Sequence, residues 1–292
     1  MGKPHRLRND PHVTDVFARF GWSIDFPATG RQESPSGYAI RDIPGDASWS
    51  ADPDRRILSI RGDPGFDHDA LRHVLLDLVL PRLLAAGDVI ALHGALIESA
   101  DRGFGLVAAS GYGKSTLGAS FHGKDSRLLG DDALVLRPDG AGYRGQCLYP
   151  SLRLFPDSLA RVLPGEVETA PVAGYTEKRR VPFGGGPDSV PLRALFRLTD
   201  PGEEIRVTRL APAAACMAII ENAFALDAED HEETQRRFLR AADLAREIPV
   251  FDLTYPRDYA RLPEVPEAIL AALDTLRKRR DPVVGSLLGR FE

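Results

Sequence analysis

The sequence contains only two cysteines in 292 residues, Cys147 and Cys216, and they lie far apart without a Cys-x-x-Cys pair. A disulfide framework and a cysteine zinc site are therefore not expected, and we interpret both residues as buried, inert thiols. No apolar run approaches the roughly 18 residues of a membrane helix, and the polar start Met-Gly-Lys-Pro-His-Arg is not followed by the apolar segment of a signal peptide. These absences predict a cytosolic protein with no membrane partner.

The chain also has no strong excess of either charge. Its net charge is −5 and its pI is near 5.9, so its composition does not indicate a nucleic-acid partner. With 43 % hydrophobic residues and no repeat, the chain is able to bury a sizeable core. We expect a small β-rich N-terminal part (residues 1–66), a larger α/β part with a mixed sheet (residues 67–280) and a loosely held tail (residues 281–292).

The N-terminal part is predicted from short alternating segments at residues 37–41 and 56–60, with a turn at residues 52–54. From residue 67 the period becomes helical. The apolar face of this helix is expected to consist of Leu71, Val74, Leu75, Leu78 and Val79, and Pro81 is expected to kink or divide the helix.

One stretch organises the rest, Gly105-Leu-Val-Ala-Ala-Ser-Gly-Tyr-Gly-Lys-Ser-Thr-Leu117, which is typical of a strand, a tight glycine loop and a helix. Such a loop turns backbone N–H groups toward a phosphate, while Lys114 adds a charge and the Ser115 hydroxyl is placed to bind Mg²⁺. The usual pattern G-x-x-x-x-G-K-[ST] has a glycine where this chain has Ala108. We predict a nucleotide-phosphate site formed by Ser110, Gly111, Tyr112, Gly113, Lys114, Ser115 and Thr116.

The strand before the loop carries a histidine. Residues 89–99 are expected to form a strand that turns at residues 100–103 into the loop strand. Pairing about that turn puts His93 opposite Ser110, within about two residues. His93 is therefore a candidate site residue, although a lone histidine on a strand is as often structural.

Two acids follow the loop helix. Residues 127–136 read as an apolar strand, the pair Asp131 and Asp132, and a second strand. Adjacent carboxylates beside a phosphate loop are able to divide the work, one holding Mg²⁺ and one accepting a proton from an attacking hydroxyl.

The stretch from residue 149 to 186 is rich in loops and basic side chains. We take Arg153, Lys178, Arg179 and Arg180 as candidate substrate residues, with a solvated basic run as the alternative for the last three. Further along, residues 192–198 and 204–210 look like a hairpin around residues 200–202. Helices are expected at residues 212–226, 229–247 and 265–279, with a strand at residues 250–255.

His93-Gly94, Ser110-Gly-Tyr-Gly-Lys-Ser-Thr116 and Leu129-Gly-Asp-Asp132 occur in an order and spacing that resemble HPr kinase/phosphorylases. Within that family the chain looks similar to bacterial HPr-kinase-like serine kinases, including lasso-peptide precursor kinases, through residues 149–158 and 175–181. The resemblance implies a phosphoenolpyruvate-carboxykinase-like P-loop fold, ATP with Mg²⁺ and phosphoryl transfer to a serine. It also implies Lys114 on phosphate, Ser115 and Asp132 on the metal, Asp131 as base and His93 in the active site.

The chain departs from the family because it keeps only Glu204-Ile-Arg206 of the Arg-Gly-rich signature tied to the phosphorylase reaction and to hexamer contacts. The leading hypothesis is therefore an ATP-dependent serine kinase acting on a peptide or small protein other than HPr. A small-metabolite kinase and a non-catalytic nucleotide-binding regulator are the alternatives. The oligomeric state is left open, with a homo-oligomer as one option.

Overall fold

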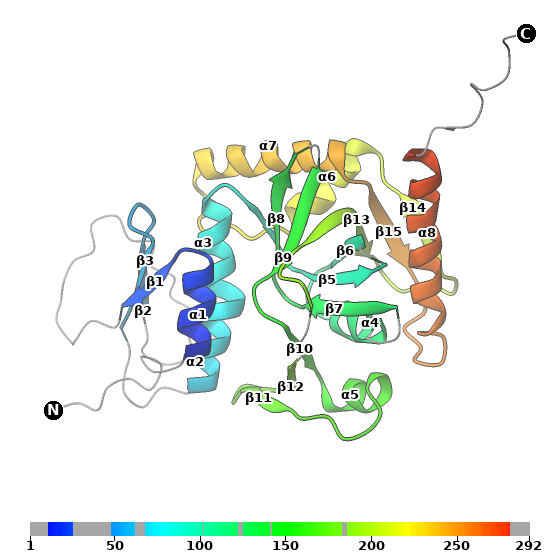
Figure 1. The fold of residues 1–292 in the computed structure, drawn as a ribbon, viewed down its shortest axis with the longest axis horizontal. Coiled ribbons are helices and arrows are strands. Elements are labelled where there is room, and N and C mark those ends of the chain that lie inside the picture. The colour runs from blue at the N-terminus through cyan, green and yellow to red at the C-terminus, as the bar shows by residue number, and fades with distance from the viewer. Residues whose placement is uncertain are drawn as a thin grey trace, which may run out of the picture.

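The computed structural model describes residues 11–25, 48–61, 68–100, 102–121, 125–140, 142–182 and 186–280. A nine-stranded sheet forms its centre, with the order β4-β8-β9-β13-β6-β5-β7 and with β15 and β14 joined through β13 (Figure 1). Its strands are β4 Ile90–Leu92, β5 Gly94–Ser99, β6 Arg102–Val107, β7 Ser126–Gly130, β8 Leu134–Asp139, β9 Gly142–Cys147, β13 Val190–Leu198, β14 Arg206–Arg209 and β15 Val250–Thr254. β13 runs parallel to β6 and β15, whereas the other pairs are antiparallel. The mixed α/β sheet predicted from the sequence is thus confirmed.

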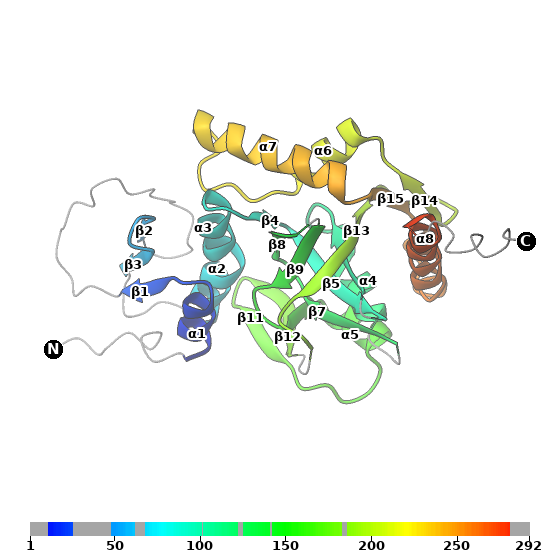
Figure 2. The same ribbon diagram turned by 45° about the horizontal axis from the view of Figure 1, so that its top comes forward.

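Helices cover both faces of this sheet. On one face lie α6 (Pro212–Glu221) and α7 (His231–Glu247), as Figure 2 shows, and their buried residues form one apolar cluster with residues of the central strands. The opposite face carries α4 (Lys114–Ser120), α8 (Glu264–Arg280) and a small sheet with the order β10-β12-β11. Because the central strands bury side chains on both faces, they read as nearly continuous apolar runs in the sequence.

The small sheet and the helix next to it lie below the central sheet in the view of Figure 1. The small sheet consists of β10 Ser151–Leu154, β11 Ala170–Ala173 and β12 Thr176–Pro182, and helix α5 (Pro156–Val162) follows β10 directly. Leu152, Leu154 and Val181 join the core beneath the central sheet. The loop-rich stretch expected here therefore contains more regular structure than its prolines and glycines indicated.

The described residues of the N-terminal part form one helix as well as strands. Strands β1 (Ser23–Asp25), β2 (Ser48–Asp52) and β3 (Ile57–Arg61) form a sheet in the order β1-β3-β2, and the predicted turn after β2 is present. Helix α1 (Pro11–Arg19) was not predicted. One apolar cluster joins this part to the helices that follow and to the central sheet, from Phe17 and Trp49 to Leu75 and Val135. The predicted segment at residues 37–41, the boundary near residue 66 and the tail at 281–292 lie outside the described residues.

The helical run from residue 68 to 86 is divided, as Pro81 indicated, but the division is a π-helical turn. It consists of α2 (His68–Val74), η2 (Leu75–Val79) and α3 (Leu80–Ala86). A π turn advances the chain by more residues per turn than an α-helix, so it shifts the side chains that reach the core. Asp77 is therefore buried, and Leu78, which was predicted on the buried face, is 38 % exposed.

The predicted hairpin of β13 and β14 is wrong. β15 lies between them, parallel to β13 and antiparallel to β14. The turn at residues 200–202 is a local signal, whereas the partner of a strand is set by burial across the whole sheet. β15 is mostly buried, whereas β14 is mostly exposed. The three later helices are present, although α6 ends at Glu221 and not near residue 226, and Asp230 caps α7 by accepting hydrogen bonds from the backbone N–H groups of Glu232 and Glu233.

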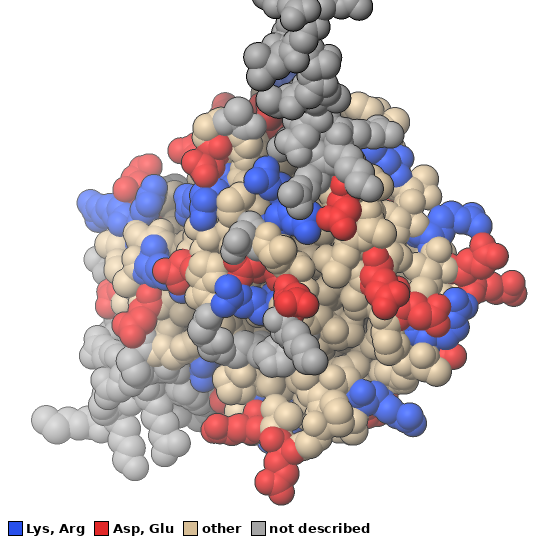
Figure 3. Space-filling model, turned by 45° about the vertical axis from the view of Figure 1, so that its right-hand side comes forward, with Lys and Arg blue, Asp and Glu red and all other residues tan. Residues whose placement is uncertain are grey.

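Both cysteines are free and buried, as expected. Basic and acidic side chains are interspersed on the face shown in Figure 3. No helix in the described part of the chain is long and apolar enough to cross a membrane.

Candidate functional site

The glycine loop connects β6 directly to α4. Gly111 and Gly113 have φ angles of 88° and 82°, which favour glycine because side chains with a Cβ are strained there. Ala108, the residue that departs from the usual pattern, is buried and does not have a positive φ. Alanine therefore fits at this position without backbone strain.

Lys114 is the first residue of α4 and is buried at the base of the loop. Its Nζ donates hydrogen bonds to the carbonyl oxygens of Ala108, at 2.8 Å, and Ala109, at 3.4 Å. Burial lowers the pKa of Lys114, and the charges of Asp131 and Asp132 oppose that shift. The ammonium group is thus held at the loop by backbone contacts and by two nearby carboxylates.

Asp131 is buried and poorly satisfied. Neither of its carboxylate oxygens makes a hydrogen bond within the usual distance and angle limits. The Ser115 hydroxyl nevertheless lies close enough to favour the ionised form of Asp131. Burial, with the charge of Asp132, raises its pKa to about 6, and Ser115 and Lys114 pull in the other direction. A buried carboxylate in this state is costly unless a cation neutralises it.

Both carboxylate oxygens of Asp132 have a partner. Arg153 Nε lies 2.5 Å from Oδ2 and Arg153 Nη2 lies 2.5 Å from Oδ1, so the two side chains form a bidentate pair. His93 Nε2 is 3.7 Å from Oδ1. Burial opposes ionisation, but the charge and the hydrogen bond of Arg153, together with the nearby His93, outweigh it, so the pKa of Asp132 is lowered. Its φ of 71° is unusual for a residue with a side chain, and the surrounding contacts have to hold it.

His93 lies where one predicted strand becomes two. β4 ends before it and β5 begins after it, and its N–H donates to the Asn222 carbonyl at 2.7 Å instead of joining a ladder. Gly94 pairs with Val107, so the register continues to Ala108 opposite His93, two residues from the predicted Ser110. The ring stacks on Phe224 with 6.1 Å between centroids.

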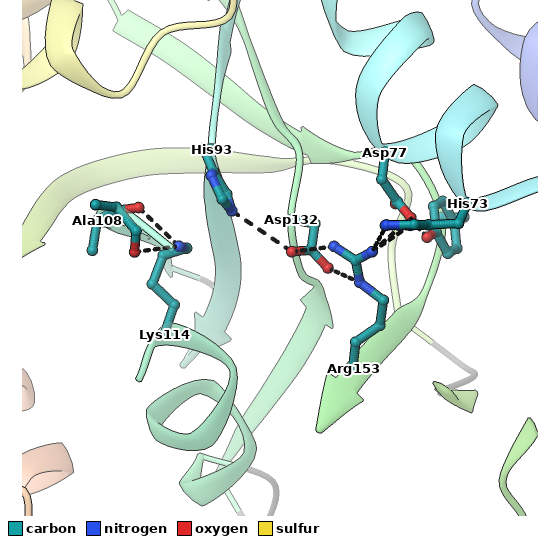
Figure 4. A network of polar contacts seen from close by, with 9 residues as sticks. His73, Asp77, His93, Ala108, Lys114, Asp132 and Arg153 are labelled. Atoms are coloured by element: carbon teal, nitrogen blue, oxygen red, sulfur yellow. Dashed lines mark hydrogen bonds and ion pairs between the residues drawn. The ribbon is translucent and has the colours of Figure 1, made fainter. Parts of the chain in front are cut away.

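Arg153 continues the polar chain away from the loop. Its Nη1 donates to Asp77 Oδ2 at 3.0 Å, His73 Nδ1 lies 2.5 Å from the same oxygen, and the Tyr149 hydroxyl donates to Asp77 Oδ1. Figure 4 shows Asp132 between His93 and Arg153, with Asp77 and His73 beyond Arg153. Sequence reasoning missed these partners, although one signal was present, a single carboxylate inside the apolar run Leu75-Leu-Asp-Leu-Val79.

A cleft of about 610 Å³ joins these groups. Ten of the predicted site residues line it, namely His93, Ser110, Gly111, Gly113, Lys114, Ser115, Thr116, Asp132, Arg153 and Lys178. The cleft is also lined by residues that were not predicted, among them His73, Leu78, Phe155, Tyr175, Tyr255 and Arg257. Of the remaining candidates, Tyr112 donates its hydroxyl hydrogen to Asp200 at 2.9 Å, and Asp131 is buried and does not line the cleft.

The basic run on β12 does not act as one group, because successive strand residues point to opposite faces. Lys178 lines the cleft, with Nζ 5.2 Å from the centre of the Phe155 ring. Arg179 instead donates to the Thr169 side chain and backbone, both at 3.2 Å. Arg180 is buried opposite Arg153 in the β10–β12 pair, and its Nε and Nη2 have no hydrogen-bond partner. Of the three, only Lys178 lines the cleft.

The described residues contain no group of three or more His, Cys, Asp or Glu that is able to hold a metal by itself. Magnesium on nucleotides needs less, because it binds through one or two protein oxygens together with water and substrate phosphates. The unpartnered Asp131 carboxylate beside Ser115 fits that requirement.

No protein-family model and no curated protein matches the sequence. Among solved structures, the chain is similar to the HPr(Ser) kinase/phosphatase from Coxiella burnetii, with 11 % sequence identity and a TM-score of 0.35. The match covers 64 % of this chain and 98 % of that one. A likeness this remote carries no conclusion about the reaction, which has to rest on the residues of the site.

Proposed function

We propose that this protein is an ATP- and Mg²⁺-dependent kinase that transfers the γ-phosphoryl group to a serine hydroxyl of a peptide or small protein. The observation that carries the proposal is that Lys114, Ser115 and the ionised Asp132 line one cleft, with a second carboxylate, Asp131, buried beside Ser115. Positioning and charge stabilisation account for most of the catalysis in phosphoryl transfer, and these groups supply both.

Ser115 and Asp131 are the residues that would hold Mg²⁺. When bound, the metal supplies positive charge that neutralises the phosphate oxygens. Lys114 would release its loop carbonyls and bind a phosphate oxygen, and the N–H groups around Gly111 and Gly113 would surround the same anion.

Asp132 lines the cleft and would accept the hydrogen bond of the attacking hydroxyl. A carboxylate has about four lone-pair directions, so the Arg153 pair leaves room for this contact. The low pKa of Asp132 suits an orienting group more than a strong base, which is sufficient for a loose transition state. The surroundings of the two acids thus favour the reverse of the roles implied by the family resemblance.

The acceptor end of the cleft favours a chain segment over a sugar. Leu78, Phe155 and Tyr175 line it with side chains that are 38 %, 47 % and 53 % exposed. Exposed apolar side chains in a cleft indicate an apolar partner, whereas a site for a polyhydroxy metabolite needs convergent hydrogen-bonding groups.

The test is transfer of labelled phosphate from ATP. Serine peptides, including peptides encoded by genes adjacent to this one, are compared with a panel of sugars and hydroxy acids. We expect labelling of peptides and none of a Ser→Ala peptide. Efficient labelling of a metabolite with no labelled peptide would support the small-metabolite alternative, and ATP binding without transfer to any acceptor would support a regulator.

A further inference from the structure

We infer that Arg153 and Asp77 are positioning residues that hold Asp132 in its working orientation, so that the π-helical turn η2 forms part of the phosphoryl-transfer site. The inference rests on the proposed function, because it assigns a task to the aspartate that orients the acceptor hydroxyl. It adds Asp77, which does not line the cleft, and gives Arg153 a task other than substrate contact.

The contacts form one continuous chain. Arg153 uses Nε and Nη2 for the two oxygens of Asp132 and Nη1 for Asp77, so all three guanidinium nitrogens are engaged by carboxylates. A planar guanidinium bound on two edges has no rotational freedom left. The orientation of Asp132 therefore depends on where Asp77 holds the other edge.

Asp77 is itself fixed. Its side chain is 1 % exposed, and Tyr149 and His73 contact its carboxylate in addition to Arg153. Burial and the charge of Asp77 raise the pKa of Tyr149 well above 10, which keeps its hydroxyl protonated and able to donate. Removing one partner of such a buried network leaves the remaining charges uncompensated, so the network is expected to respond as a unit.

Asp132 needs this support because its backbone is in a left-handed conformation, with φ at 71°. Such a conformation is strained for a residue with a Cβ and persists only where its surroundings hold it. The bidentate pair with Arg153 supplies that restraint from the side opposite His93, as Figure 4 shows.

The position of Asp77 is a consequence of the helix geometry. In a regular α-helix the apolar face would carry Leu78, whereas the π turn exposes Leu78 to the cleft and buries Asp77. The same apolar cluster that includes Leu75 and Val79 also contains Phe17 and Trp49 of the N-terminal part. Packing of the N-terminal part is thereby linked to the contacts that orient Asp132.

The experiment compares three variants of the full chain, Asp77→Asn, Tyr149→Phe and Arg153→Lys, with the wild type. Steady-state kinetics of phosphoryl transfer are measured on a peptide that the wild type phosphorylates. Tyr149→Phe removes one hydrogen bond and keeps the ring, so it tests the network even if Asp77→Asn folds poorly. We expect kcat to fall about tenfold to hundredfold while KM for ATP changes less than threefold, because orientation is lost and nucleotide binding is kept. In a fourth variant, Arg153→Ala, which removes the guanidinium group, added guanidinium at millimolar concentration should restore part of the kcat.

The matched control is Arg197→Lys. Arg197 forms a similar bidentate pair, with Asp252, at 2.7 and 3.1 Å, but it does not line the cleft. We expect its kcat to stay within twofold of the wild type. Unchanged kcat in all three network variants, or an equal loss in Arg197→Lys, would overturn the inference. A wild type that phosphorylates no acceptor would instead overturn the proposed function.

Discussion

The Nζ atom of Lys114 lies 2.8 Å from the carbonyl oxygen of Ala108, the residue that replaces a glycine of the usual phosphate-loop pattern. The lysine is thus held by its own loop until an anion competes for it. Its burial and its lowered pKa mean that a phosphate would meet a cation that is only weakly solvated.

We predict that Lys114→Ala weakens ATP binding by about 1.5–3 kcal/mol, the cost of one charge-assisted contact, and abolishes measurable transfer. Calorimetry with ATP and Mg²⁺ measures the first effect, and labelled-phosphate transfer measures the second. Arg137→Ala, which removes an exposed cation on β8, is the control. Tight ATP binding with unchanged turnover in Lys114→Ala would contradict the assignment of the loop.

Mutation should separate the two aspartates. We predict that Asp131→Asn raises the Mg²⁺ concentration needed for half-maximal transfer, because the carboxylate beside Ser115 is lost. Asp132→Asn should still bind ATP·Mg²⁺, but its rate of phosphoryl transfer should fall by about 10²–10⁴-fold. Magnesium titrations of both variants check this. If added Mg²⁺ rescues transfer only in Asp132→Asn, the roles implied by the family resemblance are correct. If Mg²⁺ rescues both variants equally, the two aspartates do not have separate roles.

Asp131 also predicts how stability depends on pH. Its pKa of about 6 is above the ordinary value of 3.8, so the folded state binds this proton more tightly than the unfolded state. Its contribution to stability is present below about pH 4 and is lost as the pH rises through 6. Without metal or nucleotide, Asp131→Asn should therefore be more stable than the wild type above pH 6, by up to about 3 kcal/mol. The difference should shrink toward pH 4.

Thermal unfolding in EDTA at pH 4.5, 6 and 8 measures this difference, with the exposed Asp139→Asn as control. Saturating ATP and Mg²⁺ at pH 8 should reverse the order, because only the wild type retains the carboxylate that would hold the metal. A Tm difference that does not change with pH would show that the Asp131 proton is not responsible.

Much of the site could be predicted because its signals are local. The glycine loop, the strand before it and the adjacent acids Asp131 and Asp132 are consecutive in the sequence, so their types and spacing determine their arrangement. The strand around His93 was predicted to within two residues in register because a short hairpin fixes it.

The missed parts depend on contacts between distant residues. Asp77 and Arg153 are 76 positions apart, and a π turn that no simple period describes brings Asp77 inward. The pairing of β13 and β14 was predicted wrongly for a similar reason, since β15 comes about 50 residues later and inserts between them. Long-range strand choice follows from the burial of the whole sheet, which a local turn signal does not report.

The basic run on β12 gives a prediction that distinguishes neighbouring residues. Lys178 faces the cleft, and Arg179 is bound to Thr169 on the other face of the strand. We predict that Lys178→Glu raises KM for a peptide acceptor about tenfold and lowers basal ATP hydrolysis less. Arg179→Glu should mainly lower the Tm by removing its hydrogen bonds. Equal effects of the two reversals on KM would indicate that the run acts as one electrostatic patch.

The exposed aromatic side chains test what kind of acceptor enters the cleft. Phe155 and Phe238 are almost equally exposed, at 47 % and 50 %, but only Phe155 lines the cleft, whereas Phe238 lies on the helix α7. If the acceptor places an apolar side chain against Phe155, truncation removes buried contact area in the complex that truncation of Phe238 leaves intact. At about 25 cal/mol per Å², partial loss of one aromatic contact is worth roughly 1–2 kcal/mol.

We therefore predict that Phe155→Ala raises KM for peptides with a leucine or phenylalanine beside the serine by about tenfold and changes KM for ATP little. Phe238→Ala should match the wild type on the same peptides. Replacing the apolar peptide residue by glycine should raise KM for the wild type and much less for Phe155→Ala, since the two truncations remove the same contact. Additive effects of the enzyme and peptide changes would show that Phe155 does not contact that residue, and the apolar end of the cleft would then have to bind another part of the acceptor.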